Sequence, residues 1–324
     1  MRILGREILE ALLPPADVIA AVERAFREAA AGRAAALPRA VLPMGRHGVF
    51  LAMVSALPRL GALGTKLVTV VERNQRRGLP TIHATYLLTD PETGAPLALM
   101  EAGFLTALRT GATSAVAARY LARPDSRVVA CFGAGVQARF QLLCLSRVLP
   151  LAEVRVVGRD PRRAAAFAER LRGELGIAVH VADSRKAAVT GADVITCATT
   201  ASKPVFSGRD IGPGAHVDGV GTFRPATREI DTLTVKRSRV VVDTYEGAWE
   251  EAGDLLIPIK AGAITRRHVR ADLAELVAGT RRGRTSPEEI TLFKSVGYAP
   301  EDAVTARLAY DRAVAGGFGT EVAL

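Results

Sequence analysis

Cysteine is scarce in this chain, which has only three among its 324 residues: Cys131, Cys144 and Cys197. Three scattered cysteines cannot form the dense disulfide framework of a small secreted domain, and their spacing matches no metal-binding motif. Cys131 and Cys197 fall in apolar runs typical of buried strands. We therefore expect the cysteines to be small core side chains in a reducing cytoplasm, and we expect no metal site.

Long apolar runs are also missing, since none approaches the roughly 20 residues of a membrane-spanning helix. The N-terminus, Met1-Arg-Ile-Leu-Gly-Arg-Glu7, reaches charged residues too soon to contain the apolar part of a signal peptide. Hydrophobic residues still make up 49% of the chain, which suffices for a large core divided between two domains. These features predict a globular, cytoplasmic protein without a membrane partner.

Lysine is rare as well, with six among the 43 basic residues, so the net charge of +10 comes from arginine. Aromatic residues make up only 5% of the chain. The arginine groups at 73–77, 266–270 and 281–284 are short, dispersed and little interleaved with aromatic residues, unlike a nucleic-acid-binding surface. We expect these arginines on solvated helix faces and loops, and we expect no nucleic-acid partner.

From about residue 126 the chain alternates regularly between strand-like and helix-like segments. Short apolar runs rich in valine recur, and amphipathic segments separate several of them. This rhythm predicts an α/β fold with a doubly wound parallel sheet of the Rossmann type. The predicted strands are 128–132, 154–157, 179–181, 194–196, 216–220 and 240–243, and the predicted helices are 136–149, 161–174 and 184–190.

The first part of the chain has a different pattern, in which strand-like runs follow one another without helices between them. This indicates an antiparallel or mixed sheet. Pro287-Glu-Glu289 predicts the start of a last helix. We expect a discontinuous α+β domain (1–122 and 298–324) and a Rossmann-type domain (123–297). The elements expected outside the Rossmann pattern are helices 16–31, 103–122 and 287–316 and strands 49–54, 64–71, 81–88 and 95–100.

The segment Arg127–Ala138 carries the most specific local signal. An apolar run, Val128–Phe132, leads into Gly133-x-Gly135-x-x-Ala138, and an amphipathic segment follows. The first glycine permits a tight turn, the second lets the backbone approach a pyrophosphate, and the small third residue lets the helix pack on the strand. Because N–H groups at a helix start favour anions, this context predicts a dinucleotide cofactor.

The end of the second predicted strand bears on which cofactor binds. Arg159 lies 21 residues after Ala138, where NAD enzymes place an acidic residue and NADP enzymes an arginine. A guanidinium can bind a 2′-phosphate bidentately, whereas the adjacent Asp160 favours NAD. We favour NADPH, with NADH as the alternative. Thr199 follows the fourth strand and is a candidate contact to the ribose or nicotinamide.

Several motifs over nearly the whole chain resemble the ornithine cyclodeaminase/mu-crystallin family. The most specific are Leu105-Thr-Ala-Leu-Arg109-Thr-Gly-Ala112 and Gly133-Ala-Gly-Val-Gln-Ala138. They occur in family order with Pro38-Arg39, Gly64-Thr-Lys66, Gly78-Leu-Pro-Thr81, Thr93–Leu99, Gly219-Val-Gly-Thr-Phe-Arg-Pro225, Arg228-Glu-Ile-Asp231, Gly253-Asp254 and Phe293-Lys-Ser-Val-Gly297.

The resemblance implies a homodimer that binds NAD(P) and a small amino-acid-derived imine or keto acid. It also implies that the discontinuous α+β domain (1–122 and 298–324) is the substrate-binding and dimerisation domain and that the Rossmann-type domain (123–297) binds NAD(P). Members include cyclodeaminases of ornithine and lysine, alanine dehydrogenases and ketimine reductases. By match to the family, Lys66 and Arg109 are the catalytic residues, and they bind substrate together with Arg39, which holds a carboxylate, Thr81 and Phe223. The implied cofactor-side residues are Thr110, Gly133, Gly135, Val136, Gln137, Ala138, Arg159, Asp160, Thr199, Val220 and Lys294.

The residue chemistry agrees with these implied roles. Paired arginines can hold the carboxylate of an α-imino acid and fix which face meets the nicotinamide. A lysine that is desolvated near another cation has a lowered pKa, which suits it to proton transfer near neutral pH. Lys66 lies in an apolar strand, where an ammonium needs a partner. Arg109 alone could equally be a helix-packing arginine.

One departure from the family pattern distinguishes the possible activities. Cyclodeaminases carry a catalytic aspartate where this sequence has Phe223, and a phenyl ring cannot move a proton. Asp218 and Asp231 lie at the wrong offset. We therefore expect an NAD(P)H-dependent reductase of a cyclic ketimine carboxylate, of the 1-pyrroline-2-carboxylate or 1-piperideine-2-carboxylate type, with Phe223 as an apolar wall. The alternatives are an ornithine cyclodeaminase, an amino-acid dehydrogenase, and a non-catalytic ligand-binding protein.

Overall fold

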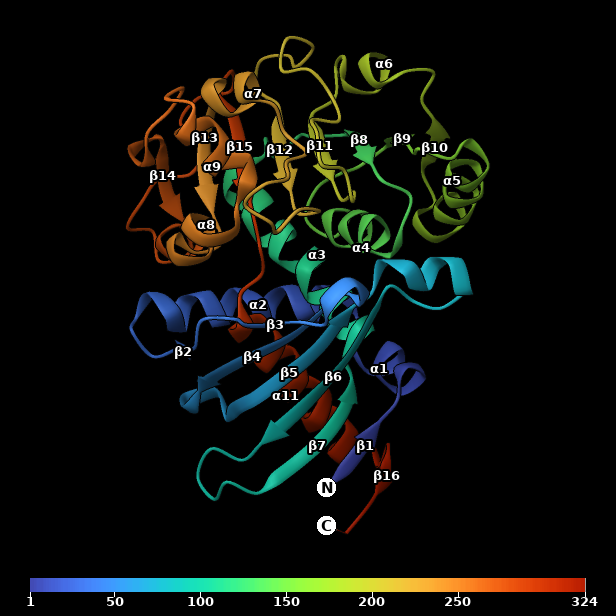
Figure 1. The fold of residues 1–324 in the computed structure, drawn as a ribbon, viewed down its shortest axis with the longest axis vertical. Helices are drawn as coiled ribbons and strands as arrows, with labels where there is room; N and C mark the ends of the chain where they lie inside the picture. The colour runs from blue at the N-terminus through green and yellow to red at the C-terminus, as the bar shows by residue number, and fades with distance from the viewer. Residues whose placement is uncertain (324) are drawn as a thin grey trace. The chain divides into compact units, whose positions relative to one another are not determined.

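The computed structural model describes residues 1–323, which form two compact units. The first contains Met1–Arg109 and the C-terminal segment from Tyr298, and the second contains Thr110–Gly297. The boundary between the units falls within α3 (Ala102–Leu121), after Arg109. The boundary predicted from the sequence was at residue 122. The helices and strands of each unit are labelled in Figure 1.

The first unit is built on a mixed sheet in the order β16-β1-β7-β6-β5-β4-β2, with β3 paired to β4. All neighbouring strands are antiparallel except β1 and β7. The central strands read as alternating sequences, so one face of the sheet is buried and the other is partly open. The strands are β1 (Arg2–Leu4), β2 (Ala35–Ala36), β3 (Ala40–Pro43), β4 (Val49–Leu57), β5 (Ala62–Val70), β6 (Ile82–Thr89), β7 (Pro96–Glu101) and β16 (Thr320–Glu321).

Helix α11 (Ala299–Gly316) covers the buried face of this sheet and also packs on α2 (Pro15–Ala30). Its first two turns are almost wholly buried, including the charged residues Glu301 and Asp302. Buried carboxylates require partners, and both belong to the site described below. The remaining elements are α1 (Arg6–Leu12) and the short 3-10 helices η1 (Gly45–His47), η2 (Pro58–Leu60) and η3 (Glu72–Arg77).

The second unit contains an eight-stranded, all-parallel sheet in the order β10-β9-β8-β11-β12-β15-β13-β14. Strands β8 and β11 of this sheet are largely apolar and almost wholly buried, as expected for strands covered on both faces. The doubly wound sheet predicted from the alternating pattern is confirmed. The strands are β8 (Val128–Phe132), β9 (Glu153–Val157), β10 (Ala178–Val181), β11 (Val194–Cys197), β12 (His216–Gly219), β13 (Ser238–Val242), β14 (Val269–Asp272) and β15 (Ile290–Lys294).

Helices cover both faces of the parallel sheet and form two apolar cores. One core includes buried residues of α4, α5 and the end of α3, and the other includes residues of α6, α7, α8 and α9. All three cysteines are buried, as expected, and burial raises the pKa of the Cys131 thiol to about 12. The helices are α4 (Val136–Leu145), α5 (Pro161–Leu175), α6 (Arg185–Val189), α7 (Thr232–Arg237), α8 (Tyr245–Glu251), α9 (Gly253–Lys260), η4 (Arg266–His268) and α10 (Leu273–Val277).

The predicted helix over 287–316 is wrong in its first part. Residues 290–294 form β15, which lies between β12 and β13 near the centre of the sheet, and the helix begins only at Ala299. The run Ile290-Thr-Leu-Phe-Lys294 is fully buried, and a short buried apolar run does not distinguish strand from helix. Pro287 and Glu288 form a turn, and Glu289 immediately precedes β15.

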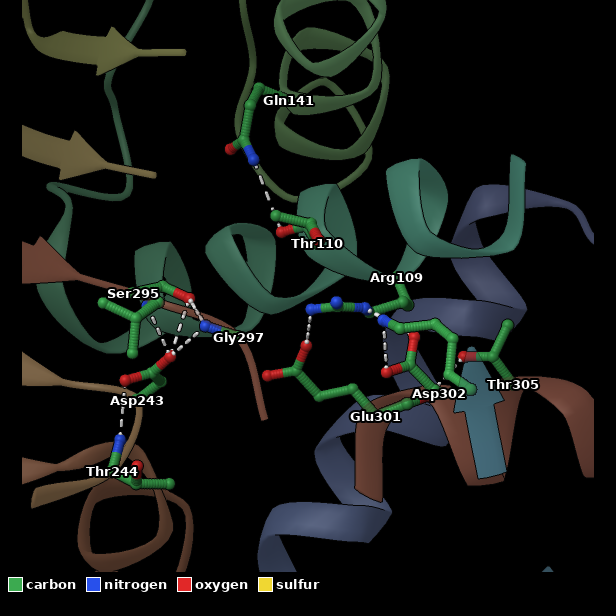
Figure 2. A network of polar contacts seen from close by, with 12 residues as sticks. Arg109, Thr110, Gln141, Asp243, Thr244, Ser295, Gly297, Glu301, Asp302 and Thr305 are labelled. Carbon is green, nitrogen blue, oxygen red and sulfur yellow. Dashed lines mark hydrogen bonds and ion pairs between the residues drawn. The ribbon is translucent and has the colours of Figure 1, made fainter. Parts of the chain in front are cut away.

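A buried carboxylate fixes the chain where it leaves β15. Asp243 accepts hydrogen bonds from Ser295 Oγ at 2.8 Å and from the backbone N–H groups of Val296 and Gly297 at 2.7 Å each, and Thr244 N donates to its other oxygen. Figure 2 shows these contacts around Asp243. The segment after the strand is therefore held by side-chain contacts rather than by regular secondary structure.

Candidate functional site

Lys66 and Arg109 lie together in the first unit, on β5 and α3, and two carboxylates of α11 hold them. Asp302 accepts from Lys66 Nζ at 2.7 Å through one oxygen and from Arg109 Nε at 2.9 Å through the other. Glu301 accepts from Arg109 Nη1 at 2.6 Å. Figure 2 shows Arg109 directed toward these two carboxylates. We call Lys66, Arg109, Glu301 and Asp302 the Lys66 cluster.

The Lys66 cluster is buried, with the Lys66 side chain only 2% exposed. Burial and the nearby charges of Arg109 and Arg39 together lower the pKa of Lys66 to about 7, against the opposing effect of Asp302. The two carboxylates raise the pKa of Arg109, which therefore remains a permanent cation. Lys66 therefore changes its charge near neutral pH.

The local sequence explains why these side chains face inward. Alternation along β5 turns Lys66 to the buried face, and its register partners Met53 and Tyr86 share that face. Burial and the charge of Asp302 raise the pKa of the Tyr86 hydroxyl, so Tyr86 stays neutral beside the cluster. Glu301 and Asp302 stand in the first turn of α11, where the helix dipole favours negative charge.

The other two residues expected to bind substrate in this unit are only partly buried. Arg39 precedes β3 and lies close enough to lower the pKa of Lys66. Thr81 immediately precedes β6, and its carbonyl accepts from Val71 N at 2.8 Å. The structure therefore groups Arg39 electrostatically with the Lys66 cluster, while Thr81 stands at the start of the neighbouring strand.

In the second unit, the glycine turn has the geometry expected for a dinucleotide fold. Gly133 follows β8 with a φ of +120°, and a Cβ there would lie 2.6 Å from Ala198 O. Only glycine fits this turn without strain. Gly135 caps the start of α4, where Gly135 and Val136 are exposed and Gln137 is partly so, while Ala138 is buried against the sheet. The amino end of α4 is thus available to an anion.

Arg159 and Asp160, which bear on the cofactor type, are used differently. Arg159 is exposed at the end of β9. Asp160 is the N-cap of α5, and its Oδ1 accepts from the backbone N–H groups of Arg162 at 2.9 Å and Arg163 at 3.3 Å. This oxygen of Asp160 is used to cap α5. The capping role is sufficient to explain why the sequence has an aspartate at this position.

The loops after β11 and β12 are joined by Glu229, which the sequence analysis did not single out. Its carboxylate accepts from Thr199 N at 2.6 Å and from Gly221 N at 2.7 Å. Thr199 follows β11, and Val220 begins the loop after β12, with its N–H bonded to Cys197 O. Both expected cofactor-side residues therefore lie at the carboxyl edge of the parallel sheet, where ligands of such folds bind.

Lys294, another expected cofactor-side residue, is buried within the same edge. Its Nζ lies 3.0 Å from Asp254 Oδ2 and donates to Thr222 O at 2.6 Å. Asp254 also accepts from the backbone N–H groups of Glu229 and Ile230 and from Thr222 Oγ1. Through these contacts Lys294 stabilises the loop that contains Thr222. Thr110 lies on α3, and its carbonyl accepts from Gln141 Nε2 at 3.4 Å (Figure 2).

Phe223 follows Thr222 and packs, partly buried, on an apolar core of the second unit. The two aspartates near it in sequence have other partners. Asp231 caps α7 by accepting from Thr234 N, and Asp218 is buried on β12, with one oxygen 3.2 Å from His216 Nε2. Neither stands in for the aspartate that cyclodeaminases carry at the position of Phe223.

Four acidic residues that organise these sites were not predicted from the sequence: Glu229, Asp254, Glu301 and Asp302. Glu229 and Asp254 lie within motifs that resemble the family, so the sequence contained a signal for these two. Glu301 and Asp302 resemble ordinary first-turn acidic residues of a helix, and Lys66, which contacts Asp302, is more than 200 residues away in sequence.

Among residues 1–323 we find no group of His, Cys, Asp and Glu side chains that could hold a metal ion. The helices of the same residues include none with the length and apolar character of a membrane-spanning segment.

The parallel sheet, the glycine turn and the exposed start of α4 define a Rossmann-type protein. A sequence model of the ornithine cyclodeaminase/mu-crystallin family matches residues 3–317. The chain belongs to this family, as its motifs indicated.

Three relatives show how far the similarity extends. A Delta(1)-pyrroline-2-carboxylate reductase of Thermococcus litoralis, solved with NADH and L-proline, is 46% identical, with a TM-score of 0.98 over 99% of this chain and 100% of that chain. An archaeal alanine dehydrogenase dimer with bound NAD is 35% identical, with a TM-score of 0.94 over 100% of this chain and 99% of that chain. Ketimine reductase mu-crystallin of Rattus norvegicus is 39% identical over 274 residues, which are 84% of this chain and 83% of the relative.

Proposed function

We propose that this protein is an NAD(P)H-dependent reductase of small cyclic ketimine carboxylates, of the 1-pyrroline-2-carboxylate type. The observation that carries the proposal is a buried lysine with a pKa of about 7 that is held beside a permanent cation. Phe223, in the place of the cyclodeaminase aspartate, favours reduction over ammonia elimination. Relatives named as pyrroline-2-carboxylate and ketimine reductases support this choice.

Each residue has a definite role in this proposal. Arg39, which is partly exposed, binds the substrate carboxylate together with Arg109. Asp302 fixes the position of Lys66, and the Lys66 ammonium keeps the imine nitrogen protonated. When bound, NAD(P)H supplies a hydride for the imine carbon, and the nitrogen keeps its proton, so the product is a cyclic secondary amine.

For the cofactor we propose NADPH as the preferred form, with NADH also accepted. The turn at Gly133 and the start of α4 suit the pyrophosphate, and the exposed Arg159 suits a 2′-phosphate. Asp160, the residue that favoured NAD, is already used as a helix cap. The relatives solved with NADH and NAD are the reason to keep the second form.

We also propose a homodimer that forms through the open face of the mixed sheet in the first unit. Leu67 on β5 and Leu87 on β6 are 43% and 37% exposed and point away from the face that α11 covers. An open apolar sheet face is typical of an interaction surface. The dimeric alanine dehydrogenase relative supports this assembly.

The proposed activity is tested by following NADPH and NADH oxidation with 1-pyrroline-2-carboxylate and 1-piperideine-2-carboxylate between pH 5 and 8. We expect turnover with at least one cyclic ketimine. Parallel assays with ornithine, for ammonia release without net redox change, and with pyruvate plus ammonia separate the cyclodeaminase and alanine dehydrogenase alternatives. Turnover in either parallel assay without ketimine reduction would refute the proposal. Tight NADPH binding without turnover of any substrate would favour a ligand-binding protein.

A further inference from the structure

Glu229 is a fully buried carboxylate that no step of the proposed reaction uses. It lies between β12 and α7, and its two oxygens accept from two different loops, through Thr199 N at 2.6 Å and Gly221 N at 2.7 Å. A carboxylate with two backbone donors at these distances forms strong, charge-assisted hydrogen bonds. Glu229 therefore joins the loop after β11 to the loop after β12.

The two loops approach each other too closely for any side chain at Gly221. A Cβ at Gly221 would lie 2.4 Å from both the N and the O of Thr199 and 2.6 Å from Glu229 Oε1. The β11 loop also lies against the glycine turn, because a Cβ at Gly133 would meet Ala198 O at 2.6 Å. Glu229 thus stabilises a close assembly of three loops at the carboxyl edge of the sheet, where a dinucleotide binds in this fold.

A second carboxylate positions Glu229 itself. Asp254 accepts from the backbone N–H groups of Glu229 and Ile230 at 2.8 Å each, and Lys294 lies 3.0 Å from the same carboxylate. The buried group therefore holds two carboxylates and one ammonium. Burial raises the pKa of Glu229 to about 7, an effect that Lys294 opposes and Asp254 adds to. Cys197 also lies near Glu229, and burial raises the pKa of its thiol well above the usual range.

We propose that Glu229 is a positioning residue for the cofactor, and that its ionised form holds the Thr199 and Gly221 loops in the conformation that binds the nicotinamide half. Protonation removes one of the acceptors, so the loops lose a hydrogen bond and the affinity for cofactor falls. This inference rests on the proposed function, which assigns the cofactor to this edge. It adds a pH dependence that originates away from Lys66.

The test measures binding of NADPH and NADH by fluorescence at pH 6, 7 and 8, in the full-length protein without substrate. For the unchanged protein we expect affinity to rise about tenfold from pH 6 to pH 8, following the ionised fraction of one group. For Glu229→Gln we expect an affinity at pH 8 that is at least tenfold lower and nearly independent of pH, with kcat at saturating cofactor changed less than threefold. Asp231→Asn, which removes a helix cap two residues away, controls for general damage and should keep the tenfold rise.

A Glu229→Gln protein with the affinity and pH dependence of the unchanged protein would overturn the inference. If Glu229→Gln does not fold, Gly221→Ala displaces the same loops without removing the titrating group. It should weaken cofactor binding at every pH, and unchanged binding would overturn the inference. Cofactor binding without ketimine turnover in the unchanged protein would defeat the proposed function alone.

Discussion

At the scale of the residue, the proposed reaction depends on the charge state of Lys66. The side chain is buried beside Arg109, which lowers its pKa, and bonded to Asp302, which limits that decrease. Lys66 is protonated below about pH 7 and neutral above it. An ammonium that titrates in this range can exchange a proton with an imine at physiological pH.

We expect the kcat/KM for ketimine reduction to fall as the pH rises through about 7, because the protonated form of Lys66 is the active one. Lys66→Met should lower kcat/KM about 100-fold to 10,000-fold, the usual contribution of a proton-transferring group. Lys66→Arg should keep a positive charge and lose the decrease near pH 7 that belongs to Lys66. Steady-state pH profiles of the three proteins measure this, with the exposed Lys236→Met as the control.

A decrease near pH 7 that persists unchanged in Lys66→Arg would assign it to the substrate imine or to another residue. That outcome would contradict the role of Lys66 as the titrating group, even if the activity of the variant were low.

Arg159 should determine the choice between the two cofactors. A guanidinium bound to a 2′-phosphate contributes about 1.5–3 kcal/mol, which corresponds to a change of about 10-fold to 100-fold in affinity. We expect Arg159→Leu to raise the KM for NADPH by that factor and to change the KM for NADH less than threefold. The exposed Arg185→Leu in the same unit is the matched control. Equal effects on both cofactors would show that Arg159 does not contact the phosphate.

At the scale of the element, α11 contributes the residues that make the Lys66 cluster possible. Its first turn carries Glu301 and Asp302, and the sheet beneath it carries Lys66 on β5. Without these carboxylates, two cations would be buried together without compensation, which is strongly unfavourable. The helix is therefore a source of electrostatic stability as well as of apolar packing.

This role predicts a large difference between two neutralised aspartates of the same helix. Asp302→Asn leaves Lys66 and Arg109 buried with one ionic partner fewer, and we expect the free energy of unfolding to fall by about 3–5 kcal/mol. Asp311→Asn removes a surface ion pair with Arg307, and we expect a change below about 1 kcal/mol. Urea unfolding measures both. Comparable losses would indicate that the cluster is not a main source of stability.

A comparison of the predicted and observed strands shows which parts of the fold could be predicted from the sequence. Strands β8 to β12 and the glycine turn were predicted because their signals are local: apolar runs, glycines and amphipathic spacing. Strand β15 was missed, because Ile290–Lys294 is a short buried run whose position between β12 and β13 is set by packing over long range. The need of Lys66 for an acidic partner could be predicted, but nothing in the sequence distinguished Asp302 from the other 32 acidic residues.

At the scale of the whole molecule, the first unit consists of segments from both ends of the chain. Residues from Tyr298 onward return to the sheet formed by the N-terminal third, and β16 pairs with β1. Residues that meet in the Lys66 cluster are therefore distant in sequence, whereas the Rossmann-type unit is continuous. This difference explains why the cofactor motifs were easier to recognise than the partners of the substrate-side cations.

The open face of the mixed sheet yields the last prediction. Since Leu67 and Leu87 are exposed there and have apolar neighbours across the strands, we expect this face to be buried between two copies of the chain. Leu67→Glu combined with Leu87→Glu should place like charges in that interface and give a monomer in sedimentation-velocity experiments. Val314→Glu is the control, because Val314 is 47% exposed on α11, which covers the opposite face. A double variant that still sediments as the unchanged protein does would place the contact on another surface.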